Sequence, residues 1–370
     1  MNDPDIVYAI RGALHVYPPC VAQILKLADL GLSVAVVAGS CDPSVMGLLA
    51  DRDIAINLVG DHRRTPGLLG KVEGFAHFAH KGWQEIRRYL GAGTVIWCGT
   101  ADTAIAIRHH LRRRRYVLSV LELYDQYPFY LRNLRTLAPM AEAVVVPELH
   151  RAWILKSWWG LTRLPVVVPN CTYAHPQSRG LSGSAADTDS SIRMLRDKTT
   201  VFYQGLITAD RDLSAVAAAL AESGSDCWLT LMGPDHGGAV DRLKEIYPQT
   251  QYVGYVPAPR HLEVTSHATV GVAYYEPSNL NNVFCAPNKI YEYAGFGVPV
   301  LCNDVPGLSE TIGAAGAGIC VDFSDTGAIA RAVETLVLEH DAYSQRASFF
   351  FEGARNNDAF QDLVLRMGLG

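Results

Sequence analysis

The chain has 370 residues, 49% of them hydrophobic and 19% charged, a balance that can fill the cores of two domains. No run of about 18 apolar residues is present, and the acidic start Met1–Asp5 is unlike a secretory signal, so the sequence predicts neither a transmembrane helix nor export. Its eight scattered cysteines include no Cys-x-x-Cys pair, which predicts reduced thiols in a cytoplasmic protein rather than disulfides or a zinc site.

The net charge of −5 is unevenly divided. Residues 1–170 carry 19 Lys and Arg against 14 Asp and Glu, whereas the remainder carries 13 against 23. Two interpretations stay open: the halves have different partners, or the difference is only surface composition.

Strands and helices alternate in the first half of the chain. This alternation predicts βαβ units and a parallel sheet. The expected strands are 6–10, 33–38, 54–59, 94–97, 116–120, 143–146 and 166–168, with helices near 19–30, 71–90, 101–113, 127–140 and 147–158.

Residues 171–198 contain few large apolar residues and predict a flexible linker or surface loop. A second alternating series follows it. The expected strands are 200–204, 228–232, 251–253, 269–274, 298–302 and 318–321, with helices near 211–223, 237–247, 258–267, 287–295, 307–313 and 325–338.

The two series predict two Rossmann-like α/β domains that face each other across a cleft. The first comprises 1–170 together with 355–370, and the second comprises 199–354. The return of the C-terminal segment is expected because Phe360, Leu363 and Val364 recur at helical spacing and need a surface to cover.

Neither opening strand is followed by Gly-x-Gly-x-x-Gly, which counts against a dehydrogenase. The phosphate-binding loop Gly-x4-Gly-Lys-Ser/Thr is also missing from the sequence, which counts against an ATPase of that class.

The segment 286–300, APNKIYEYAGFGVPV, resembles the P-N-K-[IL]-[YF]-E-Y-x-x-x-G-x-P-V segment of retaining GT-B glycosyltransferases, the large family 4 group. Further segments resemble that group in the same order. They are Tyr203-Gln204-Gly205 with Arg211-Asp212-Leu213, Leu229–Pro234, Tyr252–Pro257 and Asn303–Glu310, preceded more weakly by Glu122–Asp125 and Val166–Asn170. The resemblance implies the GT-B fold and a nucleotide-sugar donor held by the second domain.

The residue types of this segment suit a nucleotide diphosphate. Lys289 combines an ammonium with the free N–H groups at a helix start. Glu292, three residues later on the same helix face, can accept hydrogen bonds from ribose hydroxyls. Arg211 offers a second cation, and Gly205 lets the backbone approach a phosphate. The alternative for Lys289 and Glu292 is an exposed helical ion pair.

The expected donor-binding residues are Gly205, Arg211, Gly233, Val253, Tyr255, Asn282, Lys289, Ile290 and Glu292. The family commonly has a second glutamate eight residues before the ribose glutamate, where this chain has Phe284. We therefore expect Asn282 and nearby backbone N–H groups to meet the donor sugar, although such residues also cap turns.

In the first half, Leu121 occupies the position where the family often has a histidine. Either Glu122 beside it assists the transfer electrostatically, or the role of that histidine is absent from this chain. The candidate catalytic residues are Glu122, Lys289 and Arg211. Gly12 and His15 are expected in a loop that faces the diphosphate and acceptor.

Two basic segments are candidates for contact with an acceptor or membrane. Residues 108–115 include five arginines, which could equally stabilise a helix end. Trp153, Lys156, Trp158, Trp159 and Arg163 combine indoles with cations, as interfacial segments do, although core packing explains the tryptophans equally well.

The sequence thus predicts a glycosyltransferase of polysaccharide biosynthesis. It would move a hexose-type sugar, with retention and without a metal or other cofactor, from a nucleotide-diphosphate sugar to the hydroxyl of a glycan, lipid-linked glycan or small metabolite. A peripheral contact with the inner face of a membrane stays open, and no nucleic-acid partner is expected. The alternatives are a nucleotide-sugar 2-epimerase of the same fold and a non-catalytic GT-B partner subunit.

Overall fold

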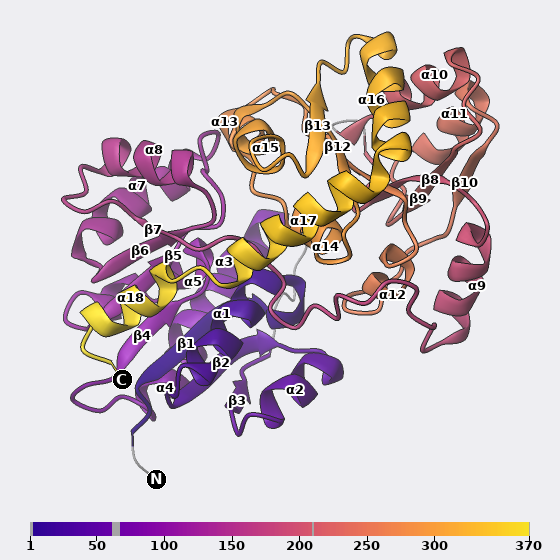
Figure 1. Ribbon diagram of the computed structural model, residues 1–370. Coiled ribbons are helices and arrows are strands. Elements are labelled where there is room, and N and C mark those ends of the chain that lie inside the picture. The colour runs from indigo at the N-terminus through magenta and orange to yellow at the C-terminus, as the bar shows by residue number, and fades with distance from the viewer. Residues whose placement is uncertain (1–2, 61–66, 209–210, 370) are drawn as a thin grey trace. The chain divides into compact units, whose positions relative to one another are not determined.

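A computed structural model describes residues 3–60, 67–208 and 211–369. The chain divides into two compact units, Met1–Tyr173 with Asn357–Gly370, and Ala174–Asn356. Each unit is a parallel sheet covered by helices (Figure 1). The predicted pair of Rossmann-like α/β domains is therefore confirmed.

The described part of the first unit contains a seven-stranded sheet in the order β3-β2-β1-β4-β5-β6-β7. Its strands are β1 (Ile6–Ala13), β2 (Val34–Ser40), β3 (Ala55–Leu58), β4 (Val95–Cys98), β5 (Tyr116–Ser119), β6 (Ala143–Val146) and β7 (Val166–Val167). Its helices are η1 (Leu14–Val16), α1 (Pro18–Asp29), α2 (Pro43–Ala50), α3 (Gly67–His77), η2 (Phe78–Gly82), α4 (Trp83–Arg87), α5 (Ala101–Ala106), α6 (Arg108–Leu111), α7 (Pro128–Leu137), η3 (Ala138–Met140), α8 (Leu149–Trp159) and α18 (Ala359–Arg366).

The described part of the second unit contains a six-stranded sheet in the order β10-β9-β8-β11-β12-β13. Its strands are β8 (Thr200–Gln204), β9 (Trp228–Met232), β10 (Thr250–Tyr252), β11 (Val270–Ala273), β12 (Val300–Asn303) and β13 (Gly318–Val321). Its helices are α9 (Ala186–Leu195), α10 (Ser214–Glu222), α11 (Ala239–Ile246), α12 (His261–Thr265), α13 (Leu280–Val283), α14 (Asn288–Gly295), α15 (Pro306–Leu308), η5 (Ser309–Gly313), α16 (Thr326–Leu338) and α17 (His340–Arg355).

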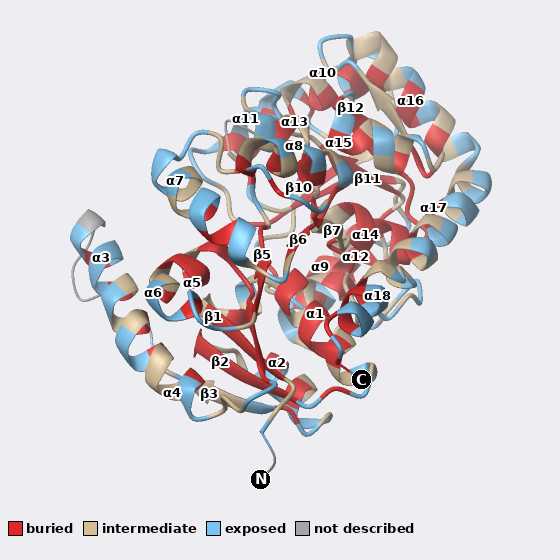
Figure 2. Ribbon diagram, turned by 90° about the vertical axis from the view of Figure 1, so that its left-hand side faces the viewer, coloured by how far each residue is buried: buried red, intermediate tan, exposed pale blue. Residues whose placement is uncertain are grey.

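Continuous apolar runs explain why the central strands lie inside the sheets. All five residues of Ile6–Ile10 in β1 are buried, and so is the whole of β8. Strands buried on both faces are typical of parallel sheets with helices on either side, and Figure 2 shows buried strands beneath helices whose outer faces are exposed.

The structure departs from the expected flexible segment at 171–198. Residues 186–195 form α9, whose Ile192 and Leu195 are buried. Ser184 before it donates hydrogen bonds to Glu263, through its backbone N at 2.9 Å and its Oγ at 2.6 Å. The sparse apolar residues of this segment are thus spaced to cover one side of the second unit, a pattern that its polar composition concealed.

The C-terminal segment packs within the first unit. Phe360 is fully buried, and its ring centroid lies 5.3 Å from that of Trp97 in β4. Lys26 Nζ donates to the Asn357 carbonyl at 2.8 Å, and Arg115 Nη2 donates to the Met367 carbonyl at 2.6 Å. The chain therefore leaves the first unit after Tyr173 and rejoins it at Asn357.

Replacing Phe360 by alanine is expected to destabilise the protein by about 3–5 kcal/mol, because it removes a buried ring and leaves a cavity beside Trp97. Denaturant unfolding measures this loss. Leu365→Ala on the same helix is the matched control, because that side chain is 62% exposed, and its effect should stay within about 0.5 kcal/mol. Equal losses in the two variants would contradict this packing.

Within the described residues, we find no helix with both the length and the hydropathy needed to span a bilayer.

Candidate functional site

Gly205 and Gly233 bring the loops after β8 and β9 into backbone contact. Gly205 N donates to the Met232 carbonyl at 2.9 Å. The backbone angle φ is positive at both glycines, +128° at Gly205 and +139° at Gly233. A Cβ on Gly233 would lie 1.9 Å from the Gly205 carbonyl oxygen. Only glycine therefore fits at Gly233, and the two loops form one tightly packed edge at the carboxyl ends of these strands.

Lys289 reaches this edge from the first turn of α14. Its Nζ lies 4.1 Å from the ring centroid of Tyr203 and 5.7 Å from that of Tyr275. A Cβ on Gly205 would lie 3.2 Å from the same Nζ. The ammonium thus lies beside Gly205, where no side chain separates it from the backbone.

Arg211 supplies a second cation on the same side of the unit. Its guanidinium carbon lies 4.0 Å from the ring centroid of Tyr275, and its backbone N donates to the Thr208 carbonyl at 3.0 Å. Both cations therefore contact Tyr275, a residue that the sequence analysis did not single out. Burial, together with the positive charge of Arg211, lowers the pKa of Lys289 to about 7, while Glu292 acts in the opposite direction.

This pKa predicts a pH-dependent affinity for a nucleotide sugar. A bound diphosphate favours the charged form of Lys289, so above pH 7 binding must be accompanied by proton uptake. Affinity should be flat below the pKa and fall by up to about tenfold per pH unit above it. Calorimetric titration with the nucleotide-diphosphate sugar expected from the sequence, from about pH 6 to about pH 8.5, measures this, with proton uptake read from buffers of different ionisation enthalpy.

Lys289→Arg is the control for the pH prediction, because a guanidinium stays charged throughout this range. Its profile should be flat. A wild-type profile that is also flat would show that Lys289 does not carry the pH dependence.

Glu292 lies on α14 within a buried polar network. Gln204 Nε2 donates to Glu292 Oε2, Thr265 Oγ1 donates to Gln204 Oε1 at 2.5 Å, and His261 Nε2 lies 3.3 Å from Glu292 Oε1. Burial alone raises the pKa of Glu292, but His261, His175 and Lys289 together outweigh it and hold that pKa below its usual value. Glu292 is therefore an ionised carboxylate. It is buried and contacts Gln204 and His261, unlike the exposed Lys289–Glu292 ion pair that was the alternative from the sequence.

His261 and Gln204 are functional candidates that the sequence analysis missed. His261 Nδ1 is buried and has no hydrogen-bond partner among the described residues. The position of Gln204 directly before Gly205 was the one sequence feature that could have identified it. His261 lies far from Gln204 and Glu292 in the sequence, and no motif identifies it.

The remaining expected donor residues differ in what they can offer a ligand. Tyr255 is 62% exposed, whereas Ile290 is fully buried in this conformation. Val253 N donates to the Leu231 carbonyl at 3.0 Å, and its own carbonyl accepts from Ser191. Asn282 is buried, and its Nδ2 donates to the Glu276 carbonyl at 2.8 Å, so in this conformation it holds its own loop together.

Residues 204–339 match the family described as Glycosyl transferases group 1. This segment includes every expected donor residue, from Gly205 to Glu292. The match spans less than half of the chain, and a search of curated proteins found no significant sequence match.

Solved structures match almost the whole chain. Anabaena HepE in complex with UDP and glucose is 15% identical, with 99% of this chain and 98% of that chain covered and a TM-score of 0.68. Sucrose-phosphate synthase from Thermosynechococcus elongatus is 17% identical, with coverages of 98% and 97% and a TM-score of 0.69. A glycosyltransferase from Rickettsia africae is 14% identical, with coverages of 98% and 96% and a TM-score of 0.66.

The chain has the GT-B fold. Identities this low establish the fold alone, but the family match over 204–339 independently supports a glycosyltransferase of this type.

In the first unit of this GT-B chain, the expected residues lie at the carboxyl ends of β1 and β5. Gly12 is inside β1, which extends to Ala13, and not in the loop where it was expected. His15 lies in η1, and its Nδ1 is buried without a hydrogen-bond partner in the described residues. The Glu122 side chain is 54% exposed, with Oε2 3.8 Å from Nη1 of the buried Arg151.

Across residues 3–60, 67–208 and 211–369, no group of three or more His, Cys, Asp or Glu side chains is arranged to hold a metal ion.

Proposed function

We propose that this GT-B chain transfers a hexose-type sugar from a nucleotide-diphosphate sugar to a hydroxyl acceptor. The observation that carries the proposal is the pairing of Lys289 and Arg211 on Tyr275, beside Gly205 and inside the segment that matches the glycosyltransferase family. UDP and UDP-glucose occupy the similar HepE structures, which supports UDP-glucose as the first donor to test.

In the proposed reaction the two cations act on the leaving group. The bond from the anomeric carbon of the sugar to the diphosphate breaks, the acceptor oxygen forms its bond to the same carbon, and negative charge grows on the departing oxygen. The proton of the acceptor hydroxyl passes to the departing diphosphate. Lys289 and Arg211 would stabilise that charge more strongly in the transition state than in the bound donor, which is electrostatic catalysis. We propose that Glu122 assists the same step electrostatically. We also propose that the sugar keeps its configuration because the acceptor attacks on the face from which the diphosphate leaves, a route that requires no enzymic nucleophile.

The proposed role of Glu292 is to bind the ribose. Its carboxylate has two oxygens and about four acceptor positions, of which Gln204 and His261 use part. The ribose hydroxyls would donate to the remainder. The buried network then holds the carboxylate in one orientation before the donor arrives, which lowers the entropy cost of binding.

We propose metal-independent transfer, because two protein cations are present to neutralise the diphosphate. Activity should be unchanged in excess EDTA. The measurement is donor consumption with and without the chelator, and with magnesium or manganese added back. Activity that disappears with EDTA and returns with either metal would contradict the proposal.

The proposed function is tested first by donor binding and then by transfer. A thermal-shift series of UDP-, GDP-, ADP- and dTDP-sugars should identify the base, since a ligand at about 100 times its Kd stabilises by about 2.7 kcal/mol. Transfer is then measured with glycan and small-molecule hydroxyl acceptors. Donor conversion to a new sugar without any acceptor indicates an epimerase, and binding without hydrolysis or transfer indicates a non-catalytic subunit.

We further propose a cytoplasmic setting and a role in polysaccharide biosynthesis. The described cysteines are all free thiols, which fits a reducing compartment. One similar structure is a glycosyltransferase involved in lipopolysaccharide biosynthesis. A peripheral membrane contact through Trp153 and Lys156 stays a proposal; Trp153 is 55% exposed on α8.

A further inference from the structure

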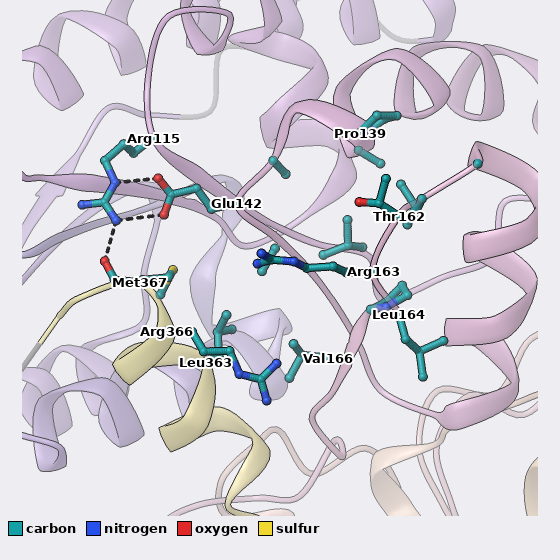
Figure 3. Close-up of a pocket in the computed structure, with 17 residues that line it drawn as sticks. Arg115, Pro139, Glu142, Thr162, Arg163, Leu164, Val166, Leu363, Arg366 and Met367 are labelled. Atoms are coloured by element: carbon teal, nitrogen blue, oxygen red, sulfur yellow. Dashed lines mark hydrogen bonds and ion pairs between the residues drawn. The ribbon is translucent and has the colours of Figure 1, made fainter.

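A pocket lies at the amino-terminal edge of the first unit's sheet. Arg115 and Glu142 stand directly before β5 and β6, and the loop 160–165 leads into β7. Helix α18 closes another side, and the volume is about 580 Å³ (Figure 3). This is the size of a small-molecule site, at the opposite edge of the sheet from Gly12 and Glu122.

Two arginines extend into this pocket. Figure 3 shows Arg163 reaching in from the loop after α8, and Arg366 reaching in from α18. Among the described residues no hydrogen bond or ion pair is found for Arg163, and Arg366 Nη2 lies 3.8 Å from Oδ2 of the exposed Asp362. Exposed pairs of that length contribute little, so both guanidinium groups are available to a ligand.

The third arginine of the pocket is already neutralised. Arg115 binds Glu142 with both ends of its guanidinium, at 2.5 Å and 2.9 Å, and caps the Met367 carbonyl of α18. A helix end explains Arg366 in part, because cations favour the last turn. It does not explain Arg163, which lies four residues beyond the end of α8.

The surroundings favour a phosphate over a carboxylate. Two guanidinium forks can share the three oxygens of a phosphate monoester, whereas a carboxylate has only two. Arg112, Arg113 and Arg114 precede Arg115, are exposed and add positive potential at this edge. The other walls are largely apolar, namely Ala138, Pro139, Leu164, Val166 and Leu363, and suit an uncharged body attached to the phosphate.

We propose that this pocket is a second binding site, for a phosphate-bearing molecule whose phosphate is held by Arg163 and Arg366. The phosphate belongs either to a soluble phosphate monoester or to an anionic lipid whose headgroup carries a phosphate monoester. This site is separate from the donor residues of the second unit and does not depend on the proposed transfer.

The test compares Arg163→Gln/Arg366→Gln with a charge-matched control in the full chain. Arg193→Gln/Arg196→Gln removes the same charge from two exposed positions of the second unit. Both variants and the parent protein carry Lys289→Gln, so that phosphate held at the proposed donor site does not contribute. Inorganic phosphate is titrated in a thermal-shift assay, and vesicles of phosphatidylcholine with or without phosphatidic acid, whose headgroup is a phosphate monoester, are used for co-sedimentation.

The pocket variant should bind phosphate at least about tenfold more weakly than the parent protein, while the Arg193/Arg196 control keeps that binding. Loss of phosphate binding alone supports a soluble ester, and an added loss of sedimentation with anionic vesicles supports a lipid headgroup. Arg163→Lys/Arg366→Lys keeps the two positive charges but loses the forked guanidinium groups. Its phosphate affinity should lie between that of the parent protein and that of the pocket variant. The proposal is overturned if the pocket variant matches the Arg193/Arg196 variant in both assays.

Discussion

Lys289→Ala is expected to abolish most transfer and to weaken donor binding at least about tenfold. The substitution removes the ammonium that lies between Tyr203 and Tyr275 beside Gly205. Loss of a charge-assisted hydrogen bond costs about 1.5–3 kcal/mol in affinity, and the leaving diphosphate loses a stabilising charge as well. Isothermal titration with UDP-glucose measures the first effect and steady-state donor consumption the second.

Lys244→Ala is the matched control, since Lys244 is a partly exposed lysine on α11 in the same unit. It should leave both quantities unchanged. If Lys289→Ala bound the donor as tightly as this control, the assignment of the diphosphate site would be wrong.

Glu292→Ala should also reduce donor affinity at least about tenfold, and in addition it should destabilise the free protein. The carboxylate is the partner of Gln204 and lies beside His261, and both would be left with unsatisfied polar atoms in a buried site. That loss costs about 1–3 kcal/mol, measurable by denaturant unfolding without any ligand.

Glu292→Gln separates the two effects. It keeps the volume and one acceptor oxygen, so the free energy of unfolding should be closer to wild type, while the affinity for the ribose should still fall. Normal donor affinity in the alanine variant would leave Glu292 with a structural role only.

The fold could be predicted because its signals are local. Alternating strand and helix patterns in each half indicated two parallel sheets, and Phe360, Leu363 and Val364 at helical spacing indicated a helix with one buried face. The helix α9 was missed because only Ile192 and Leu195 mark its buried face among polar neighbours. Its stability comes from tertiary contacts, which a local pattern does not show.

The candidate site was predictable only where its residues are adjacent in sequence. Lys289 and Glu292 both lie in the segment 286–300, whose resemblance to a glycosyltransferase motif identified them, and their spacing places them on one helix face. The partners of Glu292 are 88 positions away at Gln204 and 31 positions away at His261. Such pairings arise from the order of the strands in the sheet, and no short motif encodes them.

The return of the chain at Asn357 separates the order of synthesis from the order of folding. All of the second unit, 174–356, emerges from the ribosome before Phe360, which the core beside Trp97 requires. The first unit, although it begins the chain, therefore cannot complete its core until the second unit has been synthesised. While residues 174–356 are being synthesised, the apolar surface around Trp97 stays uncovered. Transiently exposed apolar surface of this kind makes a partly folded chain prone to aggregation.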